Sequence, residues 1–379
     1  MRNPFRYGRI VKGENFCNRE KELTEIHKAI RNGHSFWIYS PRRYGKTSLI
    51  LKAFEKINKD IKTIYFDMYN IQMLDDFARK YSQVLAKELF DWKINIKTLS
   101  RRIGSYFQNL YPKISFDSFG NPSFSLELRQ IESQADIETI LDVPEKIGER
   151  SGIKICIAFD EFQEVKRIEP FIINWMRSSF QKQINVSYVF LGSKQSLMES
   201  IFASPHSPFY EFGFKMPIYP ISHTDLSNYI KRQFQKTKLK INNNTINKIL
   251  EKSKCHPHFT QYFASVVWEL ILEGVSENQP DFTKNWMDRI IASQSLIFQN
   301  IFDQLNQNQR KVLTAIASLN ENDKLFSIKY RKRFDLPDSS TMTTTIKSLI
   351  QKDLIYKYNN KYQINNPVFV EWIKSIYTS

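Results

Sequence analysis

Cysteines and long apolar runs are scarce in this chain, and each shortage argues against a class of protein. The three cysteines, Cys17, Cys156 and Cys255, are too widely spaced for a disulfide framework or a zinc site. The longest apolar stretch, near residues 262–275, is interrupted by Glu269 and is too short to span a bilayer. The first residues also lack the apolar core of a signal peptide. We therefore expect a cytoplasmic protein with no membrane partner.

Positive charge is in excess. The chain has 55 Lys and Arg against 39 Asp and Glu, a net charge of +16. This excess permits binding to nucleic acid or to an anionic surface. A composition biased toward lysine and asparagine explains it equally well. The length of 379 residues suggests two or three domains.

The most specific chemical signal lies near the amino terminus. An apolar run at 36–39 is followed by a short loop ending in Gly45, Lys46 and Thr47, and then by an expected helix. In such a phosphate-binding loop, backbone N–H groups at a helix start cradle a polyphosphate, while the lysine and hydroxyl reach phosphate and Mg²⁺. Ser40 departs from the usual pattern, because a glycine normally stands there. The predicted ATP-binding residues of this loop are Ser40, Pro41, Arg42, Arg43, Tyr44, Gly45, Lys46, Thr47 and Ser48.

A second apolar run, residues 153–159, ends in Asp160 and Glu161. Such a run is typical of a parallel strand buried on both faces, and ligands bind at the carboxyl ends of such strands. We expect Asp160 to hold Mg²⁺ with Thr47, and Glu161 to polarise the attacking water as general base. The alternative is two surface carboxylates that close a strand.

Together these motifs resemble those of AAA+/STAND-type P-loop ATPases, especially the "archaeal ATPase" family related to the replication-initiator clade. The resemblance implies an α/β fold: a parallel P-loop NTPase sheet of the ASCE/AAA+ type, a helical lid and a C-terminal winged-helix domain. The other residues that carry it are Asn3-Pro4-Phe5, Phe16, Arg19-Glu20, Ser48-Leu49, Gly192-Ser193, Ser207-Pro208-Phe209-Tyr210, His256-Pro257, Asn366-Pro367, Phe369 and Trp372.

The resemblance implies further site residues. Ser193, after the apolar run at 186–191, is the candidate sensor of the γ-phosphate, with a simple strand-ending turn as the alternative. Phe16 and Arg19 would flank the adenine, unless Arg19 belongs to a solvated helix start. Pro257 would pack on the base, unless it only begins a helix; there Cys255 replaces the usual glycine.

An arginine finger is harder to place. Such ATPases usually carry it near residues 207–215, where Lys215 is the only cation in this chain. Its absence puts hydrolysis in trans within a ring in doubt. Arg177, on a predicted helix at 170–181, is the remaining candidate, with a solvated helix face as the alternative.

We expect three domains: a P-loop ATPase core at 1–220, a helical lid at 221–304 and a winged helix at 305–379. Strands are predicted at 63–68 and, as the fifth strand of the sheet, at 216–220.

The long stretch between the second strand and Asp160 holds predicted helices near 72–92, 97–110 and 134–149. Alternating residues predict a hairpin at 114–128, to which we assign no role.

The C-terminal region reads as a winged helix. A first helix is expected at 307–319, and a helix-turn-helix pair at 327–334 and 339–352, with Ser339 as N-cap of the second. Residues 354–364 predict the hairpin of the wing.

Contact of this domain with DNA is one expectation, and a regulatory cover folded on the ATPase is the other. The second helix of the pair offers no arginine for bidentate guanine readout, so backbone contact is more plausible than sequence reading. No histidine follows His258, so the winged-helix histidine that locks ADP in STAND regulators is absent. The candidate DNA contacts are Ser340, Thr341, Thr343, Thr344, Lys347, Lys357 and Lys361.

The sequence thus predicts a Mg²⁺-dependent ATPase whose nucleotide state repositions a winged helix, with action on double-stranded DNA. The alternative is a slow ATP/ADP-dependent signalling switch that binds a protein partner and not DNA.

Overall fold

The chain folds as two compact units. The sheet unit comprises Arg19–Arg42 and Lys46–Ile218, and the helical unit comprises Met1–Asn18, Arg43–Gly45 and Tyr219–Ser379. The computed structural model describes residues 1–11, 13, 16–57, 60–89, 110–116, 122–128, 134–320, 323–358 and 360–377.

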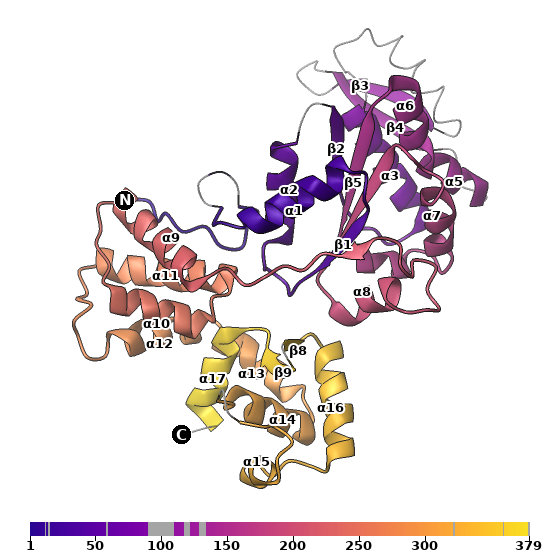
Figure 1. Ribbon diagram of the computed structural model, residues 1–379. Coiled ribbons are helices and arrows are strands. Elements are labelled where there is room, and N and C mark those ends of the chain that lie inside the picture. Colours follow the sequence, from indigo (N-terminus) through magenta and orange to yellow (C-terminus); the bar gives the residue numbers. More distant parts are fainter. Residues whose placement is uncertain are drawn as a thin grey trace. The chain divides into compact units, whose positions relative to one another are not determined.

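A five-stranded parallel sheet lies at the centre of the sheet unit (Figure 1). Its strands are β1 (Phe36–Tyr39), β2 (Ile61–Asp67), β5 (Lys154–Asp160), β6 (Val186–Gly192) and β7 (Phe214–Lys215). Their spatial order is β2–β5–β6–β1–β7. β5 is buried after its first residue and β6 is buried throughout, which is why both read as unbroken apolar runs. The predicted parallel α/β sheet is confirmed.

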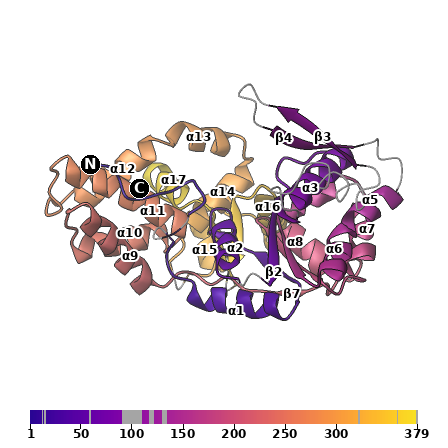
Figure 2. The same cartoon turned by 90° about the horizontal axis from the view of Figure 1, so that it is seen from above.

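Helices pack against this sheet (Figures 1 and 2). Aromatic rings pack in the core of this unit. Phe159 stacks on Phe190 at a ring-centroid distance of 5.9 Å, and Phe162 contacts Phe190 at 4.5 Å. The helices are α1 (Glu20–Arg31), α2 (Lys46–Glu55), α3 (Leu74–Leu89), α5 (Gln134–Leu141), α6 (Val143–Ser151), the 3₁₀ helix η2 (Phe162–Arg167), α7 (Ile172–Phe180) and α8 (Gln195–Phe202).

The order of the strands brings three strand ends together. β6 lies between β1 and β5, with Tyr39 opposite Gly192 in the β1–β6 ladder. Asp67 at the end of β2 stands opposite Asp160 at the end of β5. The residues that follow these strands therefore share one edge of the sheet, which is where open parallel sheets bind ligands.

The fifth strand differs from the sequence-based expectation. It was expected at 216–220, but β7 is Phe214–Lys215, and the ladder ends where the Met216 N–H donates to the Trp37 carbonyl at 2.9 Å. Pro217 follows at once, and a proline offers no N–H to continue the ladder.

The predicted hairpin between the second strand and Asp160 is present. β3 (Leu110–Phe116) and β4 (Pro122–Leu128) pair in antiparallel fashion, and Figure 2 shows them beside α3. The helix predicted near 97–110 falls almost wholly outside the described residues.

The first part of the helical unit is a bundle of short helices. Ser222 and Asn242 cap the first two, because each side chain accepts a hydrogen bond from a backbone N–H three residues on. The helices are α9 (His223–Lys236), α10 (Asn243–Ser253), α11 (Pro257–Leu272), α12 (Phe282–Ala292) and α13 (Ser295–Asp303).

The second part is a winged helix, as predicted. A two-stranded antiparallel sheet forms the wing, and Asn306 with Gln309 makes a capping box at the first helix. Its elements are α14 (Gln307–Ala317), α15 (Ile328–Arg333), α16 (Ser339–Gln351), β8 (Ile355–Tyr358), β9 (Lys361–Ile364) and α17 (Pro367–Tyr377).

The N-cap of α16 was wrongly placed in the sequence. Asp338, not Ser339, is the cap, and its carboxylate accepts hydrogen bonds from the backbone N–H groups of Ser340 and Thr341. It also accepts from the hydroxyls of Ser340 and Thr341. These four bonds hold the pKa of Asp338 well below its usual range. A charged carboxylate suits a helix start better than a hydroxyl.

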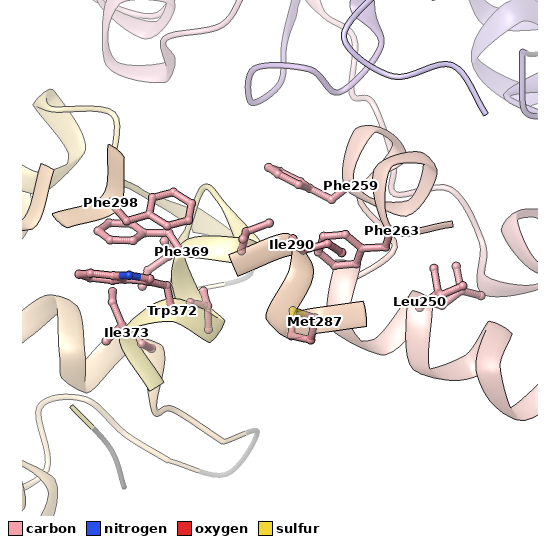
Figure 3. Close-up of a cluster of buried hydrophobic side chains, with 14 of the residues drawn as sticks. Leu250, Phe259, Phe263, Met287, Ile290, Phe298, Phe369, Trp372 and Ile373 are labelled. Atoms are coloured by element: carbon pink, nitrogen blue, oxygen red, sulfur yellow. The ribbon is translucent and has the colours of Figure 1, made fainter. Parts of the chain in front are cut away.

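One hydrophobic core runs through the helical unit. Figure 3 shows Phe298, Phe369 and Trp372 together, with Phe263 and Met287 from the bundle helices in the same cluster. Phe298 stacks on Phe369 at 4.9 Å, and the Trp372 indole donates to Ser295 at 3.1 Å. The bundle and the winged helix therefore share a single packed interior.

The amino-terminal segment packs on this core as well. Phe5 is 4% exposed and lies 5.6 Å from the ring of Phe234, while the Asn3 amide donates to Ser265 and Glu269. Among the described residues, no helix combines the length and apolar character needed to cross a membrane.

Candidate functional site

The loop after β1 folds around its own lysine. Lys46 is 6% exposed, and its ammonium donates to the carbonyls of Ser40 at 2.9 Å and Pro41 at 3.3 Å. Gly45 has φ of 88°, a left-handed conformation that favours glycine. The lysine that the motif assigns to phosphate is thus held within the loop.

Ser40 adopts the glycine position without disrupting the loop. Its backbone N–H donates to the Gly192 carbonyl at 3.4 Å. Its side chain is 3% exposed, and the hydroxyl has no hydrogen-bond partner among the described residues. Serine in place of the usual glycine therefore puts only a small polar side chain at the base of the loop.

Thr47 and Asp160 are in direct contact at the edge of the sheet. The Thr47 hydroxyl donates to Asp160 Oδ2 at 2.5 Å, and the Tyr65 hydroxyl donates to the same oxygen at 2.8 Å. Burial raises the pKa of Asp160, although these two hydroxyls and the charge of Lys46 oppose the shift. Burial and the neighbouring Asp160 also raise the pKa of Tyr65, so its hydroxyl stays protonated and donates.

These oxygens fit a magnesium ion that is shared with a nucleotide. Mg²⁺ bound with phosphates takes one or two protein oxygens and keeps several waters. A hydroxyl and a carboxylate 2.5 Å apart offer that pair of ligands. The described residues contain no group of three or more His, Cys, Asp or Glu that could hold a metal by itself.

Glu161 begins a second, adjoining network. Its backbone N–H donates to Asp160 Oδ1 at 2.9 Å, and its φ of 52° turns the chain sharply after β5. Glu161 Oε2 accepts from the Ser193 hydroxyl at 2.7 Å and from the Gln163 amide. The structure thus brings Glu161 and the candidate sensor Ser193 together across β5 and β6.

Arg19, expected at the adenine, is not solvated. It is 5% exposed at the start of α1, and its guanidinium lies 2.8 Å from Glu22, itself 6% exposed. Phe16 is half-buried, and its N–H donates to the Gly13 carbonyl at 3.1 Å.

Arg177 lies on α7, and its side chain contacts the loop that follows α8. Its Nε donates to the Pro208 carbonyl at 2.9 Å, and its guanidinium lies 4.8 Å from the centre of the Phe212 ring. The structure does not bring it into the hydrogen-bonded group around Asp160 and Glu161.

Two loop residues, Arg43 and Tyr44, belong to the helical unit, as does Pro257, the first residue of α11. The Tyr44 ring meets His256 edge-on at 5.1 Å, and Arg43 Nη1 lies 3.2 Å from His258 Nε2. Burial, with the charge of Arg43, lowers the pKa of His258 to about 4.

Cys255 stands two residues before Pro257, at the position where the resemblance led us to expect a glycine. Its φ is 53°, in the left-handed region where a glycine would be unstrained. The backbone here is one that glycine adopts readily, although the residue is cysteine.

Sequence reasoning missed three residues of these networks: Tyr65, Gln163 and His258. Tyr65 stands on β2, far from the loop in sequence, and only the pairing of β2 with β5 brings it to Asp160. Gln163 lies two residues after Glu161, and this closeness to the expected general base was its only signal in the sequence.

Comparison with known proteins decides the family. The family model described as an ATPase domain predominantly from Archaea matches residues 16–251. The chain belongs to this family. A second model, described as a probable winged helix domain, matches residues 296–375. No significant match was found among curated proteins.

Solved structures support the fold of this chain. A Walker-type ATPase of Pyrococcus abyssi is 16% identical over 96% of this chain and 97% of its own, with a TM-score of 0.64. The ORC2 protein of Aeropyrum pernix, in ADPNP–ADP complexes, is 12% identical over 99% of this chain and 100% of its own, with a TM-score of 0.50. At these identities the likeness extends to the P-loop fold alone.

Proposed function

We propose that this chain binds Mg²⁺-ATP at the carboxyl edge of its sheet and hydrolyses it there. The observation that carries this proposal is the 2.5 Å contact of the Thr47 hydroxyl with Asp160, beside the loop that encloses Lys46. Mg²⁺, when bound, would neutralise charge that develops on the phosphates. Thr47 and Asp160 would hold it, while Lys46 and the loop N–H groups of residues 40–48 bind the phosphates.

The roles of the adjoining residues follow from their contacts. Glu161 would orient and deprotonate the attacking water, and Ser193 would report the γ-phosphate. Phe16, Arg19 and Pro257 are assigned to the adenine. A catalytic part for Arg177 stays a prediction, because its Nε already donates to the Pro208 carbonyl.

Nucleotide affinity tests the binding part of this proposal. Lys46→Ala should weaken binding of a fluorescent ATP analogue at least about tenfold, since one charge-assisted hydrogen bond to phosphate is removed. Lys52→Ala, on the same helix and paired with Glu55 at its surface, is the matched control and should bind normally. Equal affinity in the two variants would refute the assignment. Chelation of Mg²⁺ should weaken binding of the ATP analogue to Lys52→Ala and to the unsubstituted chain alike.

We further propose that the nucleotide state repositions the winged helix and that this domain contacts DNA. The shared core of the bundle and winged helix supports their movement as one body. The net charge of +16 and exposed basic side chains on the winged helix favour a phosphate backbone as partner. These side chains are Lys329, Lys332, Arg333, Lys347, Lys357 and Lys361.

Hydrolysis with and without double-stranded DNA tests this second step. Stimulation that falls as salt rises would support DNA contact. Lys357→Gln with Lys361→Gln should reduce it, whereas Lys62→Gln, an exposed lysine of β2, should not. Stimulation that survives the double substitution would contradict a role for the wing.

A signalling switch that binds a protein partner is the second candidate. The absence of arginine from residues 207–215 favours it, because rapid hydrolysis in related ATPases uses such a residue. Slow turnover indifferent to DNA, with nucleotide retained through purification, is the outcome that would support the switch.

A further inference from the structure

Gln163 connects the two strand ends that carry Glu161 and Ser193. It is the second residue of η2, which follows β5, and it is 1% exposed. Its Oε1 accepts the Ser193 backbone N–H at 3.2 Å, and its Nε2 donates to Glu161 Oε2. One buried amide therefore contacts both the expected base and the backbone of the expected sensor.

The orientation of this amide follows from its partners. A backbone N–H can only donate, so the atom facing Ser193 N must be the amide oxygen. The NH₂ group then faces Glu161, a carboxylate that can only accept when ionised. Both ends of the Gln163 amide are thus matched, and the flipped amide would supply neither bond.

The surroundings are shaped to this side chain. Gly192 lies against Gln163, and a Cβ at that position would stand 2.8 Å from Gln163 Oε1 and would collide with Met198. The glycine at the end of β6 therefore leaves room for Met198 and, beside it, for the amide oxygen of Gln163.

The Ser193 hydroxyl has a single proton. It is donated to Glu161 Oε2 at 2.7 Å in this structure, and a γ-phosphate oxygen would compete for the same proton. Whenever Ser193 turns to phosphate, Glu161 loses that bond and keeps the one from Gln163.

We propose that Gln163 is a positioning residue for hydrolysis: its amide holds the Glu161 carboxylate in place after Ser193 has engaged the γ-phosphate. This inference rests on the proposed hydrolysis of ATP. Gln163 acts through Glu161 and does not itself touch the nucleotide. It should therefore affect kcat and leave nucleotide affinity unchanged.

The test uses Gln163→Met, which keeps the length of the side chain and removes every hydrogen bond of the amide, including the longer ones from Nε2 to Glu164 Oε1 at 3.4 Å and to Ser193 Oγ at 3.5 Å. We expect kcat to fall roughly tenfold to a hundredfold, with KM and the affinity for a fluorescent ATP analogue within about twofold of the unsubstituted chain. Gln195→Met, whose amide pairs with Glu199 on α8, is the matched control and should retain kcat.

A second variant guards against loss of folding. Gln163→Glu keeps the acceptor for the Ser193 N–H and puts a carboxylate oxygen in place of the NH₂ group that donates to Glu161 and, at 3.4 Å, to Glu164 Oε1. Its kcat should fall, and its melting temperature, measured in parallel, shows whether the variant is folded. An unchanged kcat in either folded variant, or a rise in KM that accounts for the loss, overturns the positioning role. If the unsubstituted chain binds nucleotide but does not hydrolyse it, the proposed function and this inference are both wrong. If the unsubstituted chain hydrolyses ATP and the folded Gln163 variants do so equally fast, this inference alone is wrong.

Discussion

His258 should make the stability of the helical unit sensitive to acid. The imidazole is 9% exposed, and Arg43, His256 and Tyr7 face it from the neighbouring segments. Its Nδ1 accepts the Gly8 N–H at 3.4 Å. Burial and the guanidinium of Arg43 lower its pKa from 6.5 to about 4. Both effects oppose the positive charge that protonation would add.

The sign and size of the effect follow from linkage. The folded pKa lies below the unfolded pKa, so the unfolded chain binds more protons as the pH falls. Stability is therefore intact above pH 6.5, is lost between pH 6.5 and about pH 4, and changes no further below that. From about pH 7.5 to about pH 5, the free energy of unfolding should fall by about 2 kcal/mol on account of this one group.

Urea denaturation, followed by tryptophan fluorescence at the two pH values, measures this loss. His258→Gln retains a hydrogen-bond acceptor and cannot titrate, so its loss should be smaller by about 2 kcal/mol. The difference between the two proteins cancels the contributions of all other titrating groups. Equal losses, within about 0.5 kcal/mol, would refute the reasoning.

Three further predictions follow from single contacts. Gly192→Ala should lower the free energy of unfolding by about 1–3 kcal/mol, because its Cβ would collide with Met198 and crowd Gln163; an unchanged urea midpoint would contradict this. Trp372→Ala, in the core shared by bundle and winged helix, should cost about 3–5 kcal/mol. A much smaller loss, measured in the same way, would count against a shared core. Asp338→Ala should lower the melting temperature more than Ser339→Ala, since only Asp338 caps α16.

Much of the fold could be predicted from the sequence because its signals are local. The buried strands β5 and β6 are unbroken apolar runs, and the loop before α2 carries residues that few other structures require. Alternating side chains and turn residues in the sequence also predicted the hairpin β3–β4 and the wing. These features need no knowledge of distant parts of the chain.

Two errors came from local signals that were weighed wrongly. The apolar residues at 216–220 suggested a strand, but Pro217 cannot donate to the ladder, so the edge strand is only Phe214–Lys215. Ser339 looked like a helix cap, yet Asp338 beside it satisfies the two free N–H groups and two hydroxyls at once.

The candidate site shows the same division. Thr47 and Asp160 could be paired from their motifs, and they lie 2.5 Å apart. Tyr65 could not be found, because its approach to Asp160 depends on the register of β2 with β5. The alternative of a solvated helix start was wrong for Arg19, because the side chain is buried with Glu22; its place beside the adenine stays a prediction.

The most direct test of the account is the rate of phosphate release from ATP with Mg²⁺ by the unsubstituted chain and by Glu161→Gln, with nucleotide affinity measured in parallel. Glutamine keeps the size of the side chain and cannot take a proton from water. The account predicts that Glu161→Gln binds ATP as well as the unsubstituted chain and releases phosphate at least about a hundredfold more slowly. Equal rates in the two proteins would contradict hydrolysis at this site.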